Sequence, residues 1–367
     1  MLKLQKFIKE NSNWRELLAA APYYLKIKED NNYILFKYDQ QESDFSNPIV
    51  CEARGLILRK SDFKVVRMAF YKFFNVGESN AAAIDWDSAT ASMKIDGSLM
   101  SIWFDNGEWH CSTNNTINAK DAPLNNGDYK TFYDLFKEAF DKYNVELDNL
   151  NPYMVYTFEL VSPFNKVVID YPEIELYHIL TVDLRNLNEV EVDIGIPKPQ
   201  FFNLNSEKDY LDLVNSFDET KEGIVVKDKF NNRLKIKTPL YFELHHLINN
   251  GVITYKKALE LVINNDYEEF LSYFPEYKDF FDKVIYEYNI GIPVTLNHIQ
   301  HFVNNWVLIN PDKTKKDFAI EINKLNPKYK MWYFLTYDGF AQERFNQIKN
   351  NALELIRFFD LKEDNND

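Results

Sequence analysis

The sequence predicts an α+β fold, in which an antiparallel-sheet domain with packed helices is followed by an all-helical C-terminal domain. Two observations lead to this prediction. Short β-rich runs are frequent up to about residue 245, and several alternate apolar and polar side chains. From about residue 246 the apolar residues recur instead with a period near 3.6, as along one face of a helix. We therefore expect two domains, 1–245 and 246–367, packed closely because no low-complexity linker separates them.

The strands of the first domain are expected where β-branched and aromatic residues cluster. These runs are 32–38, 53–60, 99–104, 108–113, 154–161, 175–182, 223–227 and 233–237. Asn106-Gly107 and Asn231-Asn232 each lie between two such runs, which predicts two tight hairpins. Hairpins favour an antiparallel sheet over a doubly wound parallel one.

Helices are expected wherever the 3.6-residue period persists. The first fourteen residues form one amphipathic segment, and the C-terminal helices are expected at 254–274, 276–289, 295–308, 315–325 and 340–361. The last segment carries an apolar stripe made of Phe345, Ile348, Ala352, Leu355 and Phe359. Such a stripe is the buried face of an amphipathic helix.

Composition limits the setting in which the protein works. No apolar run is long enough to suggest a membrane helix, and the N-terminal segment lacks the features of a signal peptide. Cys51 and Cys111 are too few for a disulfide framework or a structural zinc site, so we expect a reduced, cytoplasmic setting. The net charge of −14 argues against general attraction to nucleic acid. A nucleic-acid enzyme of this composition needs a local basic groove on an acidic body.

The segment Lys-Ile-Asp-Gly-Ser at 94–98 is the first candidate for chemistry. It precedes an expected strand, and its glycine allows the backbone to approach a ligand closely. Lys-x-Asp-Gly is a weak signal by itself, and a surface turn with a solvated lysine is the simpler interpretation.

Four further segments occur in a fixed order around Lys94. Upstream are Glu-Ala-Arg-Gly at 52–55 and Tyr-Lys-Phe-Phe-Asn at 71–75, and downstream are Phe-Glu-Leu at 158–160 and Glu-Gly-Ile-Val-Val-Lys at 222–227. The next strand, Leu-Lys-Ile-Lys at 234–237, places Lys235 and Lys237 on one face. Two lysines directed into a cleft are expected where the cleft holds phosphates.

This ordered set resembles the covalent nucleotidyltransferases, which include DNA ligases, RNA ligases and mRNA capping enzymes. It is most similar to the phage T4-type RNA ligase 1 family, through the segments at 52–55, 72–75 and 94–99. The resemblance covers residues 30–245. Two departures stand out: no arginine follows 94–97, so Arg54 must serve instead, and Asn114-Asn115 replaces a family lysine. Lys120 is the candidate substitute for that lysine.

The resemblance implies an antiparallel-sheet adenylyltransferase domain that binds ATP with Mg²⁺, or with Mn²⁺ in its place. Lys94 would attack the α-phosphorus, the AMP would pass to the 5′-phosphate of RNA, and a 3′-hydroxyl would then displace AMP. Lys237 would help pyrophosphate leave, Glu159 would contact the ribose, and Glu222 would bind the metal or face the ribose side. The remaining ATP-binding residues would be Tyr38, Arg54, Lys72 and Lys235. The adenine would lie between apolar side chains, with Ile179 or Leu180 on one side and Val225 on the other.

The same resemblance implies the partners. The substrate would be RNA with 5′-phosphate and 3′-hydroxyl ends, such as a nicked tRNA anticodon loop, and the role would be tRNA repair. The helical domain would recognise this RNA. We expect a monomer with no membrane partner, acting in the host cytoplasm if the chain is encoded by a phage.

Other interpretations of these residues stay open. Glu159 could belong to a structural salt bridge, Lys72 could lie over a core edge, and Tyr38 could be an ordinary half-buried sheet residue. An enzyme acting on DNA or on an mRNA cap is the first alternative, although no zinc-finger or OB-fold pattern follows Lys237. The second is a non-catalytic nucleotide- or RNA-binding protein, which has little use for the nucleophile Lys94.

Overall fold

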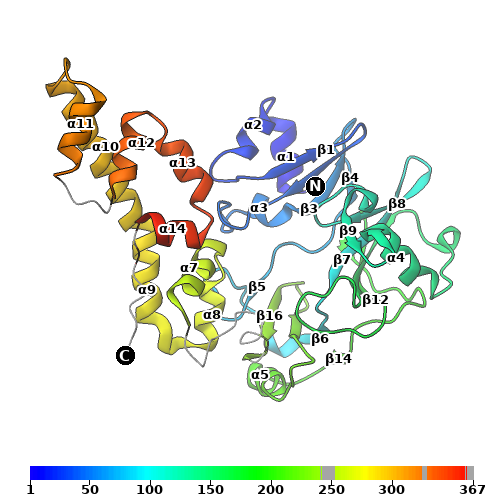
Figure 1. Ribbon diagram of the computed structural model, residues 1–367. Coiled ribbons are helices and arrows are strands. Elements are labelled where there is room, and N and C mark those ends of the chain that lie inside the picture. The colour runs from blue at the N-terminus through cyan, green and yellow to red at the C-terminus, as the bar shows by residue number, and fades with distance from the viewer. Residues whose placement is uncertain (240, 242–252, 325–328, 360, 362–367) are drawn as a thin grey trace. The chain divides into compact units, whose positions relative to one another are not determined.

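The structure, a computed structural model, describes residues 1–239, 241, 253–324, 329–359 and 361 of the chain (Figure 1). The chain forms two compact units, Met1–His245 and His246–Asp367. The first combines sheets with helices and the second is helical in its described part, so the predicted α+β class is confirmed. None of the helices in the described residues combines the length and apolar character needed to span a bilayer.

Three sheets of four or five strands, together with a two-stranded one, build the first unit. Sheet A has the order β1–β2–β3–β4, with bounds Lys26–Glu29, Tyr33–Lys37, Arg54–Arg59 and Val65–Arg67. Sheet B has the order β14–β6–β15–β16–β5, with bounds Phe201–Phe202, Thr90–Lys94, Gly223–Lys227, Arg233–Lys237 and Phe74–Asn75. Sheet C has the order β13–β12–β11–β7–β8, with bounds Asn188–Glu189, Glu175–Asp183, Met154–Val161, Ser98–Asp105 and Glu108–Thr113. All described pairings are antiparallel except β16 with β5.

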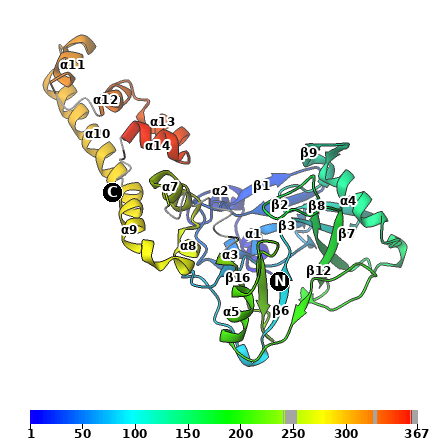
Figure 2. The same cartoon turned by 60° about the horizontal axis from the view of Figure 1, so that its bottom comes forward.

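Helices cover the outer face of each sheet. The helices of this unit are α1 Lys3–Glu10, α2 Trp14–Ala19, α3 Pro48–Glu52, α4 Phe132–Asp141 and α5 Glu207–Asn215, and a small hairpin joins β9 Pro123–Asn126 to β10 Tyr129–Thr131. Apolar residues of α1, α2 and α3 form one core with sheet A, α4 forms a second core with sheet C, and α5 a third with sheet B. Figure 2 shows α5 beside β16 and β6, and α4 beside β7.

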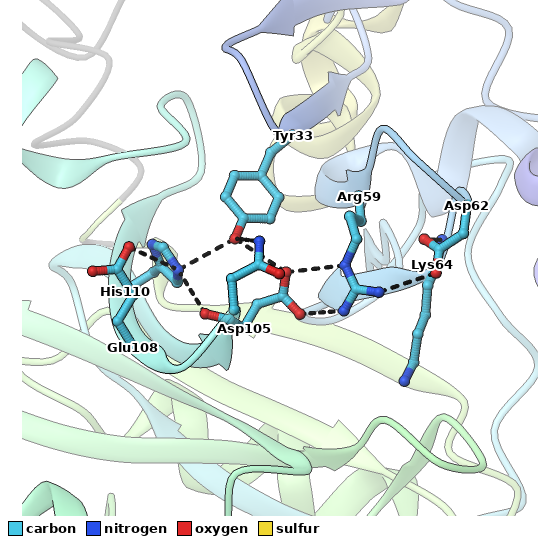
Figure 3. Close-up of polar contacts among 8 residues, drawn as sticks. Tyr33, Arg59, Asp62, Lys64, Asp105, Glu108 and His110 are labelled. Carbon is cyan, nitrogen blue, oxygen red and sulfur yellow. Dashed lines mark hydrogen bonds and ion pairs between the residues drawn. The ribbon is translucent and has the colours of Figure 1, made fainter.

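Sheets A and C pack against each other through Tyr33, Leu35 and Ile57 on one side and Trp103 and Val155 on the other. A polar network closes one end of this contact (Figure 3). The Asp105 carboxylate, almost fully buried, accepts hydrogen bonds from Tyr33 Oη and Arg59 Nε, each at 3.0 Å. Because these groups come from different sheets, the network fixes their relative position.

The two predicted hairpins form, but only one turn is as short as expected. Asn106 and Gly107, with φ of 51° and 87°, connect β7 to β8 as the two central residues of a tight turn. Between β15 and β16 the loop has five residues, 228–232. Asp228 organises this loop, because its carboxylate accepts hydrogen bonds from the backbone of Phe230 and Asn232 at 2.9 Å each. These hydrogen bonds from the Asp228 side chain stabilise a five-residue loop in place of the predicted two-residue turn.

The second unit is a set of helices with bounds α7 Tyr255–Asn264, α8 Tyr267–Tyr273, α9 Lys278–Tyr286, α10 Ile292–Ile309, α11 Lys315–Ile322, α12 Lys330–Tyr337, α13 Ala341–Ile348 and α14 Ala352–Phe359. The helix predicted at 254–274 is two helices, because Asn265 adopts the left-handed conformation with φ of 60°. The helix predicted at 340–361 is likewise α13 and α14. Its apolar stripe still faces inward, since Ile348, Leu355 and Phe359 are buried.

Candidate functional site

A cleft of about 860 Å³ lies in the first unit, lined mainly by sheets B and C. This volume falls within the range of small-molecule and cofactor sites. Six of the residues expected to bind ATP line it: Tyr38, Arg54, Lys72, Lys94, Glu159 and Lys235. The remaining two, Glu222 and Lys237, are linked to the cleft through Lys94, as described below.

Strand register explains why sheet B presents these side chains together. Lys94 of β6 is paired with Gly223 of β15, and Gly223 with Lys237 of β16. The next row along the same face contains Ser92, Val225 and Lys235, and the one after it contains Thr90, Lys227 and Arg233. Because alternate residues of a strand face the same side, cations occupy one face of β16 while Leu234 and Ile236 enter the core.

Gly223 is the residue that allows the first row to form. Its φ is +151°, a conformation that side-chain-bearing residues rarely adopt. A Cβ at this position would lie 2.0 Å from the Ile236 carbonyl oxygen and 2.7 Å from Lys237 Cα. Only glycine therefore lets β15 and β16 approach closely enough to bring Lys237 and the neighbouring Glu222 to Lys94.

Lys94, Glu222 and Lys237 form an ion-paired group at this end of the cleft. Lys94 Nζ donates to Glu222 Oε2 at 2.6 Å, and Lys237 Nζ lies 3.8 Å from Glu222 Oε1. Glu222 is 2% exposed, so its charge is removed from water and depends on these two cations. The Glu222 carboxylate thus lies between two lysines: one oxygen accepts a hydrogen bond from Lys94, and the other faces Lys237.

Asp96 and Gly97 hold the turn that follows Lys94. The buried Asp96 carboxylate accepts hydrogen bonds from the backbone N–H of Val168 and Ile169, at 2.9 and 2.8 Å, and from Tyr241 Oη at 3.1 Å. A Cβ on Gly97 would lie 2.5 Å from the Leu160 carbonyl oxygen. These two residues therefore fix the position of the turn against β11. Their contacts give the Asp-Gly pair of the motif a structural role.

Glu159 of β11 lines the same cleft as Lys94. Burial raises the pKa of this carboxyl to about 7, although Lys94 and Arg54 act in the opposite direction. No hydrogen bond or ion pair between Glu159 and another described residue was found, so the salt-bridge interpretation gains no support. A carboxyl in this state can accept or donate a hydrogen bond near neutral pH.

Arg54 and Lys72 line the cleft from the side of sheet A. Arg54 Nη1 is buried and has no hydrogen-bond partner in the described structure, which is uncommon for a buried polar group. The Arg54 guanidinium lies over the ring of Phe73, at 5.5 Å from its centroid. Lys72 Nζ lies over the ring of Phe45 at 4.9 Å and over that of Tyr38 at 5.4 Å. Lys72 therefore packs against aromatic rings and also lines the cleft.

Arg67 is a buried cation behind the cleft that sequence reasoning missed. Its side chain is fully buried and donates to Ser101 Oγ at 3.0 Å and to the carbonyl oxygen of Gly55. Burial, followed by the charge of Arg54, lowers the pKa of Arg67 to about 9. Its contacts fix the start of β3 and so the position of Arg54.

A second missed group ties the sheets together at the far end of the cleft. Glu189 of β13 accepts two hydrogen bonds from the Arg233 guanidinium, at 2.5 Å each, and lies 3.4 Å from Lys227 Nζ. All three residues line the cleft. Because β13 belongs to sheet C and β16 to sheet B, this pair links the two walls.

The apolar part of the cleft contains the expected residues. Ile179, Leu180 and Val225 all line it. The β11–β12 pairing shifts register between Thr157 and Phe158, and Ile179 is the residue of β12 left without a partner there. Such a bulge changes the direction of a side chain, and this bulge lies in the wall of the cleft.

Lys120, the candidate substitute for the missing family lysine, lies elsewhere. Its side chain is exposed, its Nζ is 4.7 Å from the centroid of the Tyr133 ring, and it does not line the cleft. Asn114 lines the cleft instead. The Asn118 side chain caps the short helical turn that carries Lys120, which keeps this lysine in place.

The acidic residues fit a metal that binds together with a nucleotide. No group of three or more His, Cys, Asp or Glu side chains among the described residues is arranged to hold a metal ion alone. Mg²⁺ usually takes one or two carboxylates and completes its shell with phosphates and waters. Glu222, the buried carboxylate beside Lys94, can supply one such ligand, and its charge raises the pKa of the nearby Glu159.

Comparison with known proteins identifies one matching family and several proteins to which the chain is similar. Residues 52–241, just over half of the chain, match a family described as RNA ligase. A bifunctional polynucleotide kinase/RNA ligase of Autographa californica nuclear polyhedrosis virus is 28% identical over 70% of the chain, which spans only 40% of that protein's length. An RNA ligase of Rhodothermus phage RM378 is 26% identical over 90% of both chains. A solved archaeal ATP-dependent RNA ligase aligns over 94% of this chain and 82% of its own, at 12% identity and a TM-score of 0.46.

Proposed function

The chain belongs to the RNA ligase family of the T4 RNA ligase 1 type, and from this premise we propose that it seals RNA ends with ATP through a lysyl-AMP intermediate on Lys94. The ends would carry a 5′-phosphate and a 3′-hydroxyl. The observation that carries the proposal is the position of Lys94. It lies in a nucleotide-sized cleft, hydrogen-bonded to the buried Glu222, with Lys237 on the other side of that carboxylate.

In the first step, Lys94 Nζ would attack the α-phosphorus of ATP. A nitrogen–phosphorus bond forms and the bond to pyrophosphate breaks. The ammonium must first lose a proton, and Glu222 Oε2, at 2.6 Å, already accepts a hydrogen bond from it. Lys235 and Lys237, two strands away across β15, would stabilise the charge that develops on the phosphates and on the leaving pyrophosphate.

In the two later steps the AMP would move to RNA and then leave. An oxygen of the RNA 5′-phosphate attacks the lysyl-AMP phosphorus, which frees Lys94 and produces an RNA-adenylate. The 3′-hydroxyl of the second end then attacks the 5′-phosphate, loses its proton and expels AMP. Arg54 is suited to hold the phosphate in these steps, because its Nη1 is buried in the cleft wall without a partner in the described structure.

The remaining roles follow from the positions of the side chains. Glu159, which lines the cleft with Lys94, would bind the ribose hydroxyls, and Ile179, Leu180 and Val225 would hold the adenine. Mg²⁺, or Mn²⁺, would be held by Glu222 together with the phosphates and would neutralise part of their charge. Lys72 and Tyr38 lie at the cleft edge on the sheet A side, where they would contact the phosphate tail.

The direct test is a sealing assay with a single-stranded RNA that has a 5′-phosphate and a 3′-hydroxyl. We expect joined or circular product with ATP and Mg²⁺, much less with GTP, and none with a 5′-hydroxyl RNA. Faster joining of a nicked DNA duplex would indicate a DNA ligase, and label taken from GTP would indicate a capping enzyme. A tRNA cut in its anticodon loop is the substrate we would compare first with unstructured RNA, because tRNA repair and recognition by residues 246–367 are part of the proposal.

A further inference from the structure

Three lysines extend the cationic surface of the cleft across sheet A. Lys26 of β1 is paired with Lys37 of β2, and Lys37 is paired with Arg54 of β3, which lines the cleft. Lys28 lies two residues from Lys26 and so faces the same side of β1. We call Lys26, Lys28 and Lys37 the lysine strip. It begins at an edge strand of the sheet and ends beside Arg54.

Two lysines of the strip are anchored next to the cleft by the same residue. Lys28 Nζ donates to the Asn115 carbonyl oxygen at 2.8 Å, and Lys37 Nζ donates to the Asn115 side chain. Asn115 follows Asn114, which lines the cleft. The end of β8 therefore holds both ammonium groups near the cleft, while none of the three lysines lines the cleft itself.

The charge of the strip is only partly compensated. Lys26 Nζ lies 2.7 Å from Asp39 Oδ2, and this is the carboxylate that acts on Lys37 as well. Burial lowers the pKa of Lys37, and Lys26, Lys28 and Arg54 lower it further. Three neighbouring cations thus act on Lys37, and Asp39 is the carboxylate that acts against them, in a chain whose net charge is −14. Like charges at this spacing repel each other, which an anionic ligand would relieve.

We propose that the lysine strip binds the phosphodiester backbone of the RNA strand whose 5′ end reacts in the cleft. This inference rests on the proposed function and names the surface along which the RNA reaches it. The nucleotide occupies the cleft, whose lining excludes the strip, so the ligand of the strip is a different anion that continues outward from Arg54. Lys26 and Lys28 are exposed on the edge strand, where a long polyanion has access.

The test compares two double variants with the same change in charge. In K28Q/K37Q two lysines of the strip lose their charge. In the control K137Q/K208Q two exposed lysines of α4 and α5, paired with Asp141 and Asp212, lose theirs. Binding of a 5′-phosphorylated single-stranded RNA is measured for both and for the wild type between 50 and 200 mM salt. Formation of the AMP adduct is measured against ATP concentration in parallel.

Loss of two phosphate contacts on single-stranded RNA should reduce the slope of log affinity against log salt by about 1.4. Over the fourfold range of salt, the affinity of the wild type should therefore fall about sevenfold more than that of K28Q/K37Q. The control should keep the wild-type slope. Adduct formation and its ATP dependence should be unchanged in both variants, and K28R/K37R, which retains the charge, should restore RNA binding.

Three results would overturn the inference. One is the same RNA affinity and salt dependence in K28Q/K37Q as in the control. Another is a higher ATP requirement with normal RNA binding, which would make the strip a site for the phosphate tail of ATP. The third is lost RNA binding that K28R/K37R does not restore, together with a lower melting temperature, which would show that the lysines only hold Asn115. If wild-type protein forms no adduct and seals no RNA, the proposed function fails, whatever the strip binds.

Discussion

Glu159 gives a prediction that concerns stability and needs no substrate. Its pKa in the folded protein is raised by burial from 4.5 to about 7. Between these two values the folded state retains a proton that the unfolded state releases. The free energy of unfolding therefore falls as pH rises from about 4.5 to about 7, and the contribution is constant above that pH. Glu159→Gln has no proton to release and so lacks this decrease.

The size of the effect follows from the two pKa values. The interval from 4.5 to about 7, at about 1.4 kcal/mol for each pH unit, gives about 3.5 kcal/mol as an upper limit. The variant should thus gain stability relative to the wild type as pH rises. Most of the gain should develop between pH 5 and 7, and a realistic value is about 1–3 kcal/mol at pH 8.

Urea unfolding of both proteins at several pH values, without nucleotide, measures this difference directly. Glu219→Gln, in an exposed loop of the same unit, is the control and should follow the wild type at every pH. A constant difference between Glu159→Gln and the wild type would show that Glu159 has the same pKa in the folded and the unfolded protein. The reasoning about its burial would then be wrong.

Two further substitutions test the contacts that hold the strands and sheets around the cleft in place. Gly223→Ala places a Cβ 2.0 Å from the Ile236 carbonyl oxygen, so we expect a loss of about 3 kcal/mol or more in denaturant unfolding and no sealing activity. Gly195→Ala, where φ is also positive but no atom lies within 4 Å, should cost only about 1 kcal/mol, and equal costs would contradict the close approach. Asp105→Ala removes the carboxylate that accepts a hydrogen bond from Arg59, and it should lower the free energy of unfolding by about 2 kcal/mol. A melting temperature equal to that of the wild type would show that the network is not needed to join sheets A and C.

Strands with a regular alternation could be predicted from the sequence because the same alternation decides burial. In β16, Leu234 and Ile236 enter the core while Lys235 lines the cleft, as the period of two indicates. The motif order around Lys94 likewise predicted which distant segments meet, and six of the eight expected residues line one cleft. The roles assigned to them stay predictions.

Features that depend on long-range contacts could not be predicted. Strand β6, which carries Lys94, has the sequence Thr-Ala-Ser-Met-Lys, and within it only Ala91 is buried, because residues along the whole strand border the cleft. Arg67 carries a charge that usually indicates solvent, yet it is fully buried because carbonyl and hydroxyl oxygens of distant segments surround it. The break at Asn265 depends on one residue in the left-handed conformation, which asparagine tolerates but does not require.

The central claim is that Lys94 carries AMP. The measurement that tests it most directly is incubation of the purified protein with α-labelled ATP and Mg²⁺, followed by a denaturing gel, beside Lys94→Ala. We expect label on the wild type only, transferred to 5′-phosphorylated RNA when it is added. An unlabelled wild type that still binds ATP, or equal label on Lys94→Ala, would contradict the account and favour a nucleotide-binding protein without ligase activity.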